Sequence, residues 1–234
     1  MTIKLLHSTP LWVASTAIRK CWASEAKSDT LDSMKQAGRL RGYDITGDKD
    51  KELIERIGNK NKHSSTLEHL NYSFDIDGIS RACLQEVARH RHASISVKST
   101  RYTLKELKDE TSFLPDTEEN YDRVSDYCVL TGSSDVNYSI IEALEKLSQQ
   151  LKLKTTSNDE LKYMLPEAYK TSLVWTVNAR SLQNFLALRT SPSALWEIRD
   201  LANELYNKLP EEHKYLFIDS LYKDNICSYR SNLN

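Results

Sequence analysis

The 234-residue sequence contains no long hydrophobic run and no closely spaced cysteines. No stretch approaches the ~20 apolar residues that a membrane-spanning helix needs, and the apolar run within residues 1–12 is too short for a signal peptide. The four cysteines form no CxxC pair, and their spacing suits neither a zinc site nor a small disulfide framework; they are Cys21, Cys83, Cys128 and Cys227. Free thiols are typical of a reducing compartment, so we expect a soluble, cytoplasmic protein without a bound metal.

A surplus of charge is also missing. Lys and Arg number 32 against 33 Asp and Glu, which gives a formal net charge of -1. This balance provides no bulk field that would draw the whole molecule to nucleic acid or to an acidic membrane. The sequence also shows no internal repeat, no low-complexity segment and no linker. We therefore expect one α/β domain over residues 1–234.

Two hydrophobic periodicities are present along the chain, one typical of strands and one of helices. The segments expected to be strands are 2–7, 70–77 and 166–178. The segments expected to be helical are 10–22, 49–58, 80–88, 140–151 and 181–189, with a last helix that opens at Ser191-Pro192 and turns Leu195 inward. Gly58 and Gly78 should end their elements. Residues 26–48 should form a long lid or binding loop, and the tail after Tyr222 should fray.

Positive charge is concentrated in one short stretch, residues 89–102, which read RHRHASISVKSTRY and include no acidic residue. A solvated helix end could account for a pair of arginines, because cations complement the negative end of a helix dipole. However, four hydroxyl side chains interleave with the cations, and this combination suits a phosphate monoester. A nucleic-acid groove would also need aromatic side chains for base stacking, and Tyr102 is the only aromatic here. The pattern favours a discrete phosphate.

Two further stretches could bear on function. In NARSLQNFLALR (178–189), Arg180 and Arg189 flank a predicted helix; they could be ordinary surface residues or mark a ligand site at the end of an apolar strand. In HSSTLEH, His63, Glu68 and His69 could suggest a metal site. The spacing differs from HExxH and no third ligand set is evident, so we expect no metal there.

Together these stretches resemble the flavin-dependent thymidylate synthases. The hallmark of that family is Arg-His-Arg, seven residues and then Ser, matched here by 89–91 and Ser99, with Arg101 and Tyr102 following. KHSSTLEH and TVNARSLQNFLALR match in the same order and at comparable spacing. The resemblance extends over roughly residues 10–218.

The resemblance implies a central sheet flanked by helices, in a homotetramer whose active sites lie between subunits. It implies reductive methylation of dUMP to dTMP, with the methylene group from methylenetetrahydrofolate and the electrons from NADPH through FAD. The cofactor would carry the hydride chemistry, while the protein supplies binding and electrostatics. No nucleic acid, membrane or protein partner is implied.

The resemblance also assigns roles to residues by their place in the matched motifs. Those implied to contact FAD are His63, Ser65, Glu68, Arg89, His90, Arg91, His92, Val97, Asn178, Arg180 and Asn184. Those implied to contact dUMP are Glu86, Arg89, Val97, Lys98, Ser99, Thr100, Arg101, Lys162 and Arg189. His63, Ser99 and Arg189 are implied to be catalytic. Arg189 would lie at the uracil edge, where a cation stabilises negative charge.

Some positions depart from the commonest family pattern. They are Ser96-Val97 in place of Asn-Glu, Glu86 in place of Gln, Lys162 in place of Arg, and Cys21 and Ser193 in place of Ser and His. We expect altered affinities with the reaction unchanged. The alternative hypothesis is a non-enzymatic nucleotide- or RNA-binding module that uses residues 89–101 as its basic surface.

Overall fold

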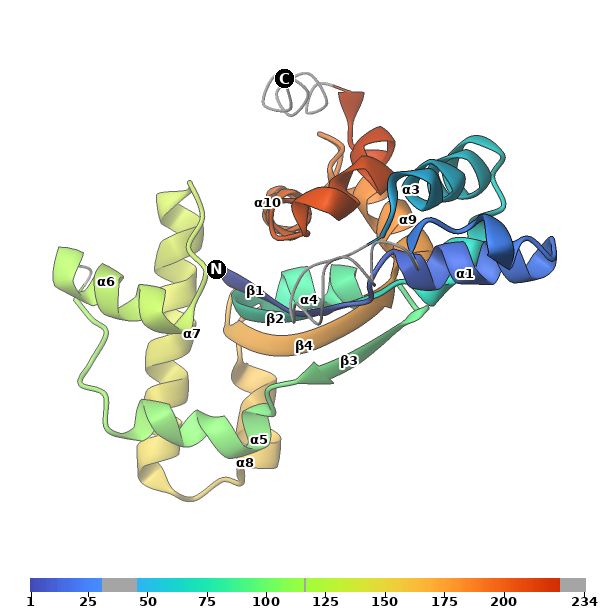
Figure 1. Cartoon of the computed structure of the whole chain (residues 1–234). Helices are drawn as coiled ribbons and strands as arrows, with labels where there is room; N and C mark the ends of the chain where they lie inside the picture. The colour runs from blue at the N-terminus through green and yellow to red at the C-terminus, as the bar shows by residue number, and fades with distance from the viewer. Residues whose placement is uncertain (31–45, 116, 224–234) are drawn as a thin grey trace. The chain divides into compact units, whose positions relative to one another are not determined.

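The computed structural model describes residues 1–30, 46–115 and 117–223 (Figure 1). The chain divides into two compact units. Unit 1 comprises residues 1–2, 76–89 and 96–173, and unit 2 comprises the remaining segments, 3–75, 90–95 and 174–234.

A four-stranded sheet has the order β1-β2-β4-β3. Its strands are β1 (Thr2–Ser8), β2 (Asn71–Ser80), β3 (Ala93–Val97) and β4 (Lys170–Asn178). Along β4 the buried side chains alternate with less buried ones from Thr171 to Val177, which confirms the period of two expected of a half-buried strand. The sequence analysis missed β3. Its apolar residues do alternate with Ser94 and Ser96, but the strand has only five residues and none of its side chains is buried.

The described residues of unit 2 form four helices and several shorter turns of helix. The helices are α1 (Trp12–Cys21), α3 (Asp48–Ile54), α9 (Ala179–Arg189) and α10 (Trp196–Asn207). The short elements are η1 (Glu25–Lys27), the π-helical η2 (Glu55–Lys60), η3 (Ser64–His69), η6 (Glu211–Leu216) and η7 (Ile218–Ser220). Helix α9 packs against α10 and η3, and α1 packs against α3 and η3.

Unit 1 is built around the long helix α7 (Ser134–Leu153) (Figure 1). The predicted stripe of Ile140, Leu144, Leu147 and Leu151 is buried in its core. The other elements are α4 (Arg81–Ala88), α5 (Thr100–Thr103), η4 (Leu104–Lys108), α6 (Glu118–Tyr127), α8 (Asn158–Leu161) and η5 (Lys162–Met164). In the described part of the chain, no helix is both long and apolar enough to cross a membrane.

Several expected boundaries were wrong. Gly78 does not end β2, which runs on to Ser80; its φ of 77° is the left-handed conformation that glycine adopts without strain. Gly58 does not end its helix either, since the chain continues as a π-helix to Lys60. The last predicted helix begins at Trp196 rather than at residues 191–192, and Leu195 is 42% exposed because it precedes the first turn.

Two loop predictions fall largely outside the described residues. Of the polar segment 26–48, residues 31–45 are not described. Of the tail after Tyr222, residues 224–234 are not described.

Candidate active site

The residues predicted to bind ligands separate into two groups according to unit. Unit 1 carries Glu86, Arg89, Val97, Lys98, Ser99, Thr100, Arg101 and Lys162. Unit 2 carries His63, Ser65, Glu68, His90, Arg91, His92, Asn178, Arg180, Asn184 and Arg189. All the predicted dUMP contacts except Arg189 therefore belong to unit 1, and all the predicted FAD contacts except Arg89 and Val97 belong to unit 2.

Arg189, the last residue of α9, is joined to His90 from the Arg-His-Arg motif. Its Nε donates a hydrogen bond to Nε2 of His90 at 3.1 Å. Since Nε2 accepts, His90 is neutral in this arrangement and carries its proton on Nδ1. The His90 ring also packs edge-on against Phe185, with 4.7 Å between ring centroids, and Phe185 packs on the buried Trp175. A hydrogen bond and an aromatic stack thus set the direction of the two predicted functional side chains.

Arg180, at the other end of α9, pairs with a second predicted residue. Its Nη1 lies 2.7 Å from Oε1 of Glu68, and both side chains are about half exposed, at 56% and 46%. Asn178 caps the same helix, because its Oδ1 accepts from the backbone N–H of Ser181 at 2.9 Å. These contacts join η3 to the start of α9. The sequence missed the capping role of Asn178, although Asn is a favoured N-cap residue.

The remaining predicted FAD contacts of unit 2 are exposed. They are His63, Ser65, Arg91, His92 and Asn184. Arginine guanidinium and asparagine amide groups provide the charge-assisted and neutral donors that a flavin pyrophosphate and ring edge need. The donor set of unit 2 therefore fits FAD.

In unit 1, Arg101 forms an ion pair with Asp159, a carboxylate that the sequence analysis did not identify. Nε of Arg101 donates to Oδ1 of Asp159 at 2.5 Å, and Nη2 donates to Oδ2 at 3.0 Å. These bonds raise the pKa of the guanidinium above its ordinary value. The side-chain amide of Asn158 donates to the backbone oxygen of Arg101 at 3.0 Å. The pairing spans 58 positions of sequence, so no local pattern signals it.

The other cations of this group are held more loosely. The Lys98 ammonium lies 3.3 Å from Oε2 of Glu106, and the side chains are 39% and 46% exposed. The Lys162 ammonium lies 5.6 Å from the centre of the Tyr163 ring.

Two further predicted residues of unit 1 lie at helix ends. Ser99 is the N-cap residue of α5. Arg89 is the C-cap residue of α4 and is exposed.

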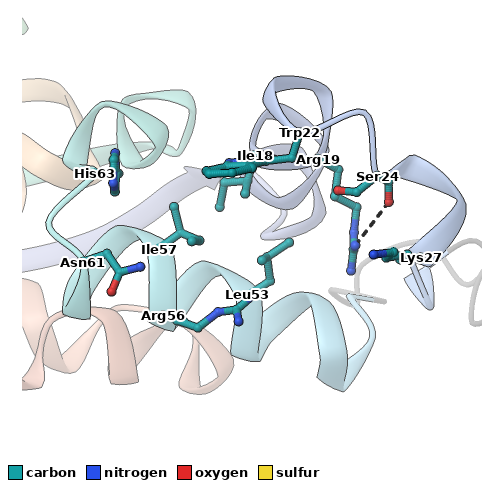
Figure 2. Close-up of a pocket in the computed structure, with 10 residues that line it drawn as sticks. All are labelled: Ile18, Arg19, Trp22, Ser24, Lys27, Leu53, Arg56, Ile57, Asn61 and His63. Atoms are coloured by element: carbon teal, nitrogen blue, oxygen red, sulfur yellow. Dashed lines mark hydrogen bonds between the residues drawn. The ribbon is translucent and has the colours of Figure 1, made fainter.

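A pocket of about 480 Å³ in unit 2 opens beside His63 (Figure 2). Side chains of α1 face those of α3 and η2 across it, and Trp22 is 69% exposed. Its lining residues are Ile18, Arg19, Trp22, Ser24, Lys27, Leu53, Arg56, Ile57, Asn61 and His63. Arg19 is already paired with Asp50, so Lys27 and Arg56 are the cations of this lining that could meet a ligand. Among the described residues the lining also holds an indole and no carboxylate, so it suits a planar anionic ligand. The sequence analysis did not identify Trp22, Lys27 or Arg56.

The described residues include no group of three His, Cys, Asp or Glu side chains placed to hold a metal ion. His63, Glu68 and His69 lie on or beside η3, and Glu68 is ion-paired with Arg180.

Comparisons with known proteins identify one family. The family model described as "Thymidylate synthase complementing protein" matches residues 4–213. A flavin-dependent thymidylate synthase of Campylobacter jejuni is 57% identical over 224 residues, which cover 96% of this chain and 99% of the relative. The enzyme of the same name from Wolinella succinogenes is 56% identical over 217 residues, covering 93% and 97%.

A solved structure gives the same result. Thymidylate synthase X from Helicobacter pylori, crystallised with FAD and dUMP, is 50% identical and superposes with a TM-score of 0.84. The match covers 94% of this chain and 99% of the solved chain.

Proposed function

This chain belongs to the flavin-dependent thymidylate synthase family, and on that premise we propose which of its residues carry out the reductive methylation of dUMP to dTMP. FAD, when bound, supplies the hydride chemistry, with NADPH as reductant and methylenetetrahydrofolate as one-carbon donor. The protein contributes binding, orientation and charge. Because a carbon is transferred to the pyrimidine, we class the enzyme as a methyltransferase.

The observation that carries the proposal is the placement of Arg189. A guanidinium whose direction is set by His90 can stabilise negative charge on the uracil ring, and an electron-rich ring of this kind is what makes carbon 5 nucleophilic towards an electrophile. No cysteine lies within the basic stretch to form a covalent bond with the ring. Burial raises the pKa of the Cys128 thiol to about 12, which keeps it from serving as a thiolate nucleophile.

Unit 1 supplies the site for the nucleotide phosphate. Arg89, Arg101 and Lys162 offer positive charge, and the hydroxyl groups of Ser99 and Thr100 offer short neutral donors. Glu86 lies on α4 and would contact the pyrimidine rather than the phosphate, because two anions repel each other.

Unit 2 supplies the flavin contacts. Arg91 and Arg180 suit the pyrophosphate, and Asn178 and Asn184 suit polar edges of the ring system. His63 and Trp22 line the same pocket. We propose that this pocket binds part of a planar ligand, either flavin or folate. The homotetramer with shared active sites, which the family resemblance implies, remains part of this proposal. So do the single domain and the cytoplasmic location that the sequence predicts.

The proposal is tested by one purified sample loaded with FAD. It should be yellow, should lose its visible flavin absorbance when NADPH is added without oxygen, and should form dTMP from dUMP and methylenetetrahydrofolate. A colourless protein that binds RNA and cannot be reconstituted with FAD would instead support the non-enzymatic binding module.

A further inference from the structure

Two neighbouring residues of α8 hold Arg101 at two points. The Asp159 carboxylate lies along the Nε edge of the guanidinium, with distances of 2.5 and 3.0 Å. The Asn158 amide holds the backbone oxygen of Arg101 at 3.0 Å. Side chain and main chain of Arg101 are therefore both fixed to α8, although both partners of the ion pair are 55% exposed.

The helix that grips Arg101 also carries Lys162. α8 begins with a capping box between Ser157 and Glu160 and passes directly into η5, whose first residue is Lys162. Asp159 and Lys162 are three residues apart along this continuous helical segment, and residues at that spacing share a face. The helical segment that orients Arg101 therefore also sets the position of Lys162.

We propose that Asp159 is a positioning residue for the nucleotide phosphate: it holds the Nε edge of Arg101 so that the Nη1 side, together with Lys162, receives the phosphate of dUMP. This inference rests on the proposed function. It extends that function by adding Asp159, a carboxylate outside the basic stretch, which acts on the phosphate through Arg101.

Two effects of Asp159 oppose each other. Its negative charge repels a phosphate, but the charge is compensated by the bidentate pair and, at an exposed position, is screened by salt. Its hold on the guanidinium fixes one orientation, which matters more here because Lys162 is a point charge without a fork that could direct the phosphate. If positioning is the larger effect, removal of the carboxylate weakens dUMP binding; if repulsion is larger, removal strengthens it.

The ion pair is a favourable target because exposed pairs contribute little to folding stability. The experiment uses the FAD-loaded enzyme and compares Asp159→Asn, Asp159→Glu and Arg101→Ala with wild type. Asp126→Asn is the matched control, since Asp126 is an exposed aspartate of α6 in the same unit. Dissociation constants are measured for dUMP and for deoxyuridine, which lacks the phosphate, alongside kcat and KM for dUMP.

We expect Asp159→Asn to raise the dUMP dissociation constant and KM about tenfold, the lower end of what one charge-assisted hydrogen bond contributes. Its kcat and its affinity for deoxyuridine should stay within about twofold of wild type, as should every property of Asp159→Glu and Asp126→Asn. Adding Asp159→Asn to Arg101→Ala should have little further effect, because the two residues act as one unit.

Unchanged or tighter dUMP binding in Asp159→Asn would overturn the inference, and so would an equal loss of affinity for deoxyuridine. A wild-type enzyme that does not prefer dUMP to deoxyuridine would instead contradict the phosphate site of the proposed function.

Discussion

At the scale of single residues, the contact between Arg189 and His90 joins a residue proposed to act on dUMP to a residue proposed to contact FAD. His90 belongs to the Arg-His-Arg motif and Arg189 ends α9, 99 positions later. The bond uses Nε, one of the five N–H donors of a guanidinium. A lysine at position 189 would keep the positive charge but would lack the Nε donor that fixes the direction of the side chain. The contributions of charge and of orientation can therefore be tested separately at this position.

We expect Arg189→Ala to abolish dTMP formation while leaving the flavin half-reaction intact. The loss of one preorganised donor at a developing charge costs on the order of a hundredfold to a thousandfold in turnover. The variant should still bind FAD and still be reduced by NADPH, since that step does not involve the uracil ring. The measurement is a pair of assays on one sample, anaerobic flavin reduction and dTMP yield.

Arg189→Lys is the matched variant and should fall between Ala and wild type in dTMP yield. Near-normal dTMP formation by Arg189→Ala would rule out the role given to Arg189.

The sequence indicated candidate functional residues but not the side chains that they contact. Arg101, Arg180 and Arg189 stand out because their types and spacings match motifs. Their partners Asp159, Glu68 and His90 lie 58, 112 and 99 positions away. Contacts over such separations depend on the tertiary fold, so no local pattern can indicate which side chain meets which arginine. Asp159 was missed for this reason.

At the scale of elements, α1 and α3 are joined through one buried carboxylate. Asp50 is fully buried and accepts from Nε and Nη2 of Arg19 and from the hydroxyls of Ser28 and Thr30. Burial by itself raises the pKa of Asp50, but these hydrogen bonds outweigh it and the pKa lies below its ordinary value. Residues 28–30 are thereby held against the start of α3.

The same segment supplies the N-terminal cap of α3. Gly47, the N-cap residue, has no side chain, and the Asp29 carboxylate accepts from the backbone N–H groups of Lys49 and Asp50 instead, at 2.9 and 3.2 Å. A Cβ on Gly47 would lie 2.3 Å from that carboxylate. Glycine at position 47 therefore leaves the space in which the Asp29 carboxylate caps α3.

We expect Asp50→Asn to destabilise the protein by about 3 kcal/mol at pH 7, because it leaves the buried Arg19 without a counter-charge. This corresponds to a decrease in Tm of roughly 6–12 °C for a chain of this size. The contribution of a carboxylate with a depressed pKa is complete above its unfolded pKa of about 3.9 and is lost as pH falls through the folded pKa. The difference in Tm between variant and wild type should therefore shrink below about pH 4.

Asp48→Asn is the control for this prediction, since its carboxylate lies in the same helix but is 97% exposed. It should change Tm little at any pH. A Tm difference for Asp50→Asn that stays constant from pH 7 to pH 3 would show that the ionised carboxylate is not what stabilises this segment.

The elements that the sequence predicted well are those with a strong periodic pattern. β2, β4 and α7 each bury a regular set of side chains, and the period alone indicates their type. β3 was missed because it buries little, and η2 because a π-helix inserts a residue without any change in composition. Gly58 and Gly78 were misread as ends because a glycine signals conformational freedom and not termination.

At the scale of the whole molecule, the chain passes between its two units five times, after Thr2, Asp75, Arg89, Ile95 and Leu173. No linker marks these points in the sequence, so the sequence offered no sign of the division. The Arg-His-Arg motif itself is divided, with Arg89 in unit 1 and His90 in unit 2. The family could nevertheless be recognised from the sequence, because the resemblance rests on three ordered blocks and does not depend on the fold.

Within unit 2, the geometry of α9 bears on whether one chain can complete a site. The Glu68–Arg180 pair joins the His63 block to the start of α9, whereas Arg189 is its last residue. With a rise of about 1.5 Å per residue, these two ends of the helix lie about 14 Å apart. Reacting atoms must approach to about 3–3.5 Å. This separation supports the proposal that the His63 block of one chain works with Arg189 of another.

We therefore expect two inactive variants, His63→Ala and Arg189→Ala, to restore activity when their subunits are mixed. A shared site with both native residues forms when one chain supplies His63 and another supplies Arg189. In a random equal mixture about a quarter of the sites in a closed homo-oligomer meet this condition. The measurement is dTMP yield before and after exchange, with exchange itself followed by co-purification of differently tagged chains. The control is each variant carried through the same exchange alone, which should stay inactive. Exchange without any recovery of dTMP formation would mean that each site is completed within one chain, despite the length of α9.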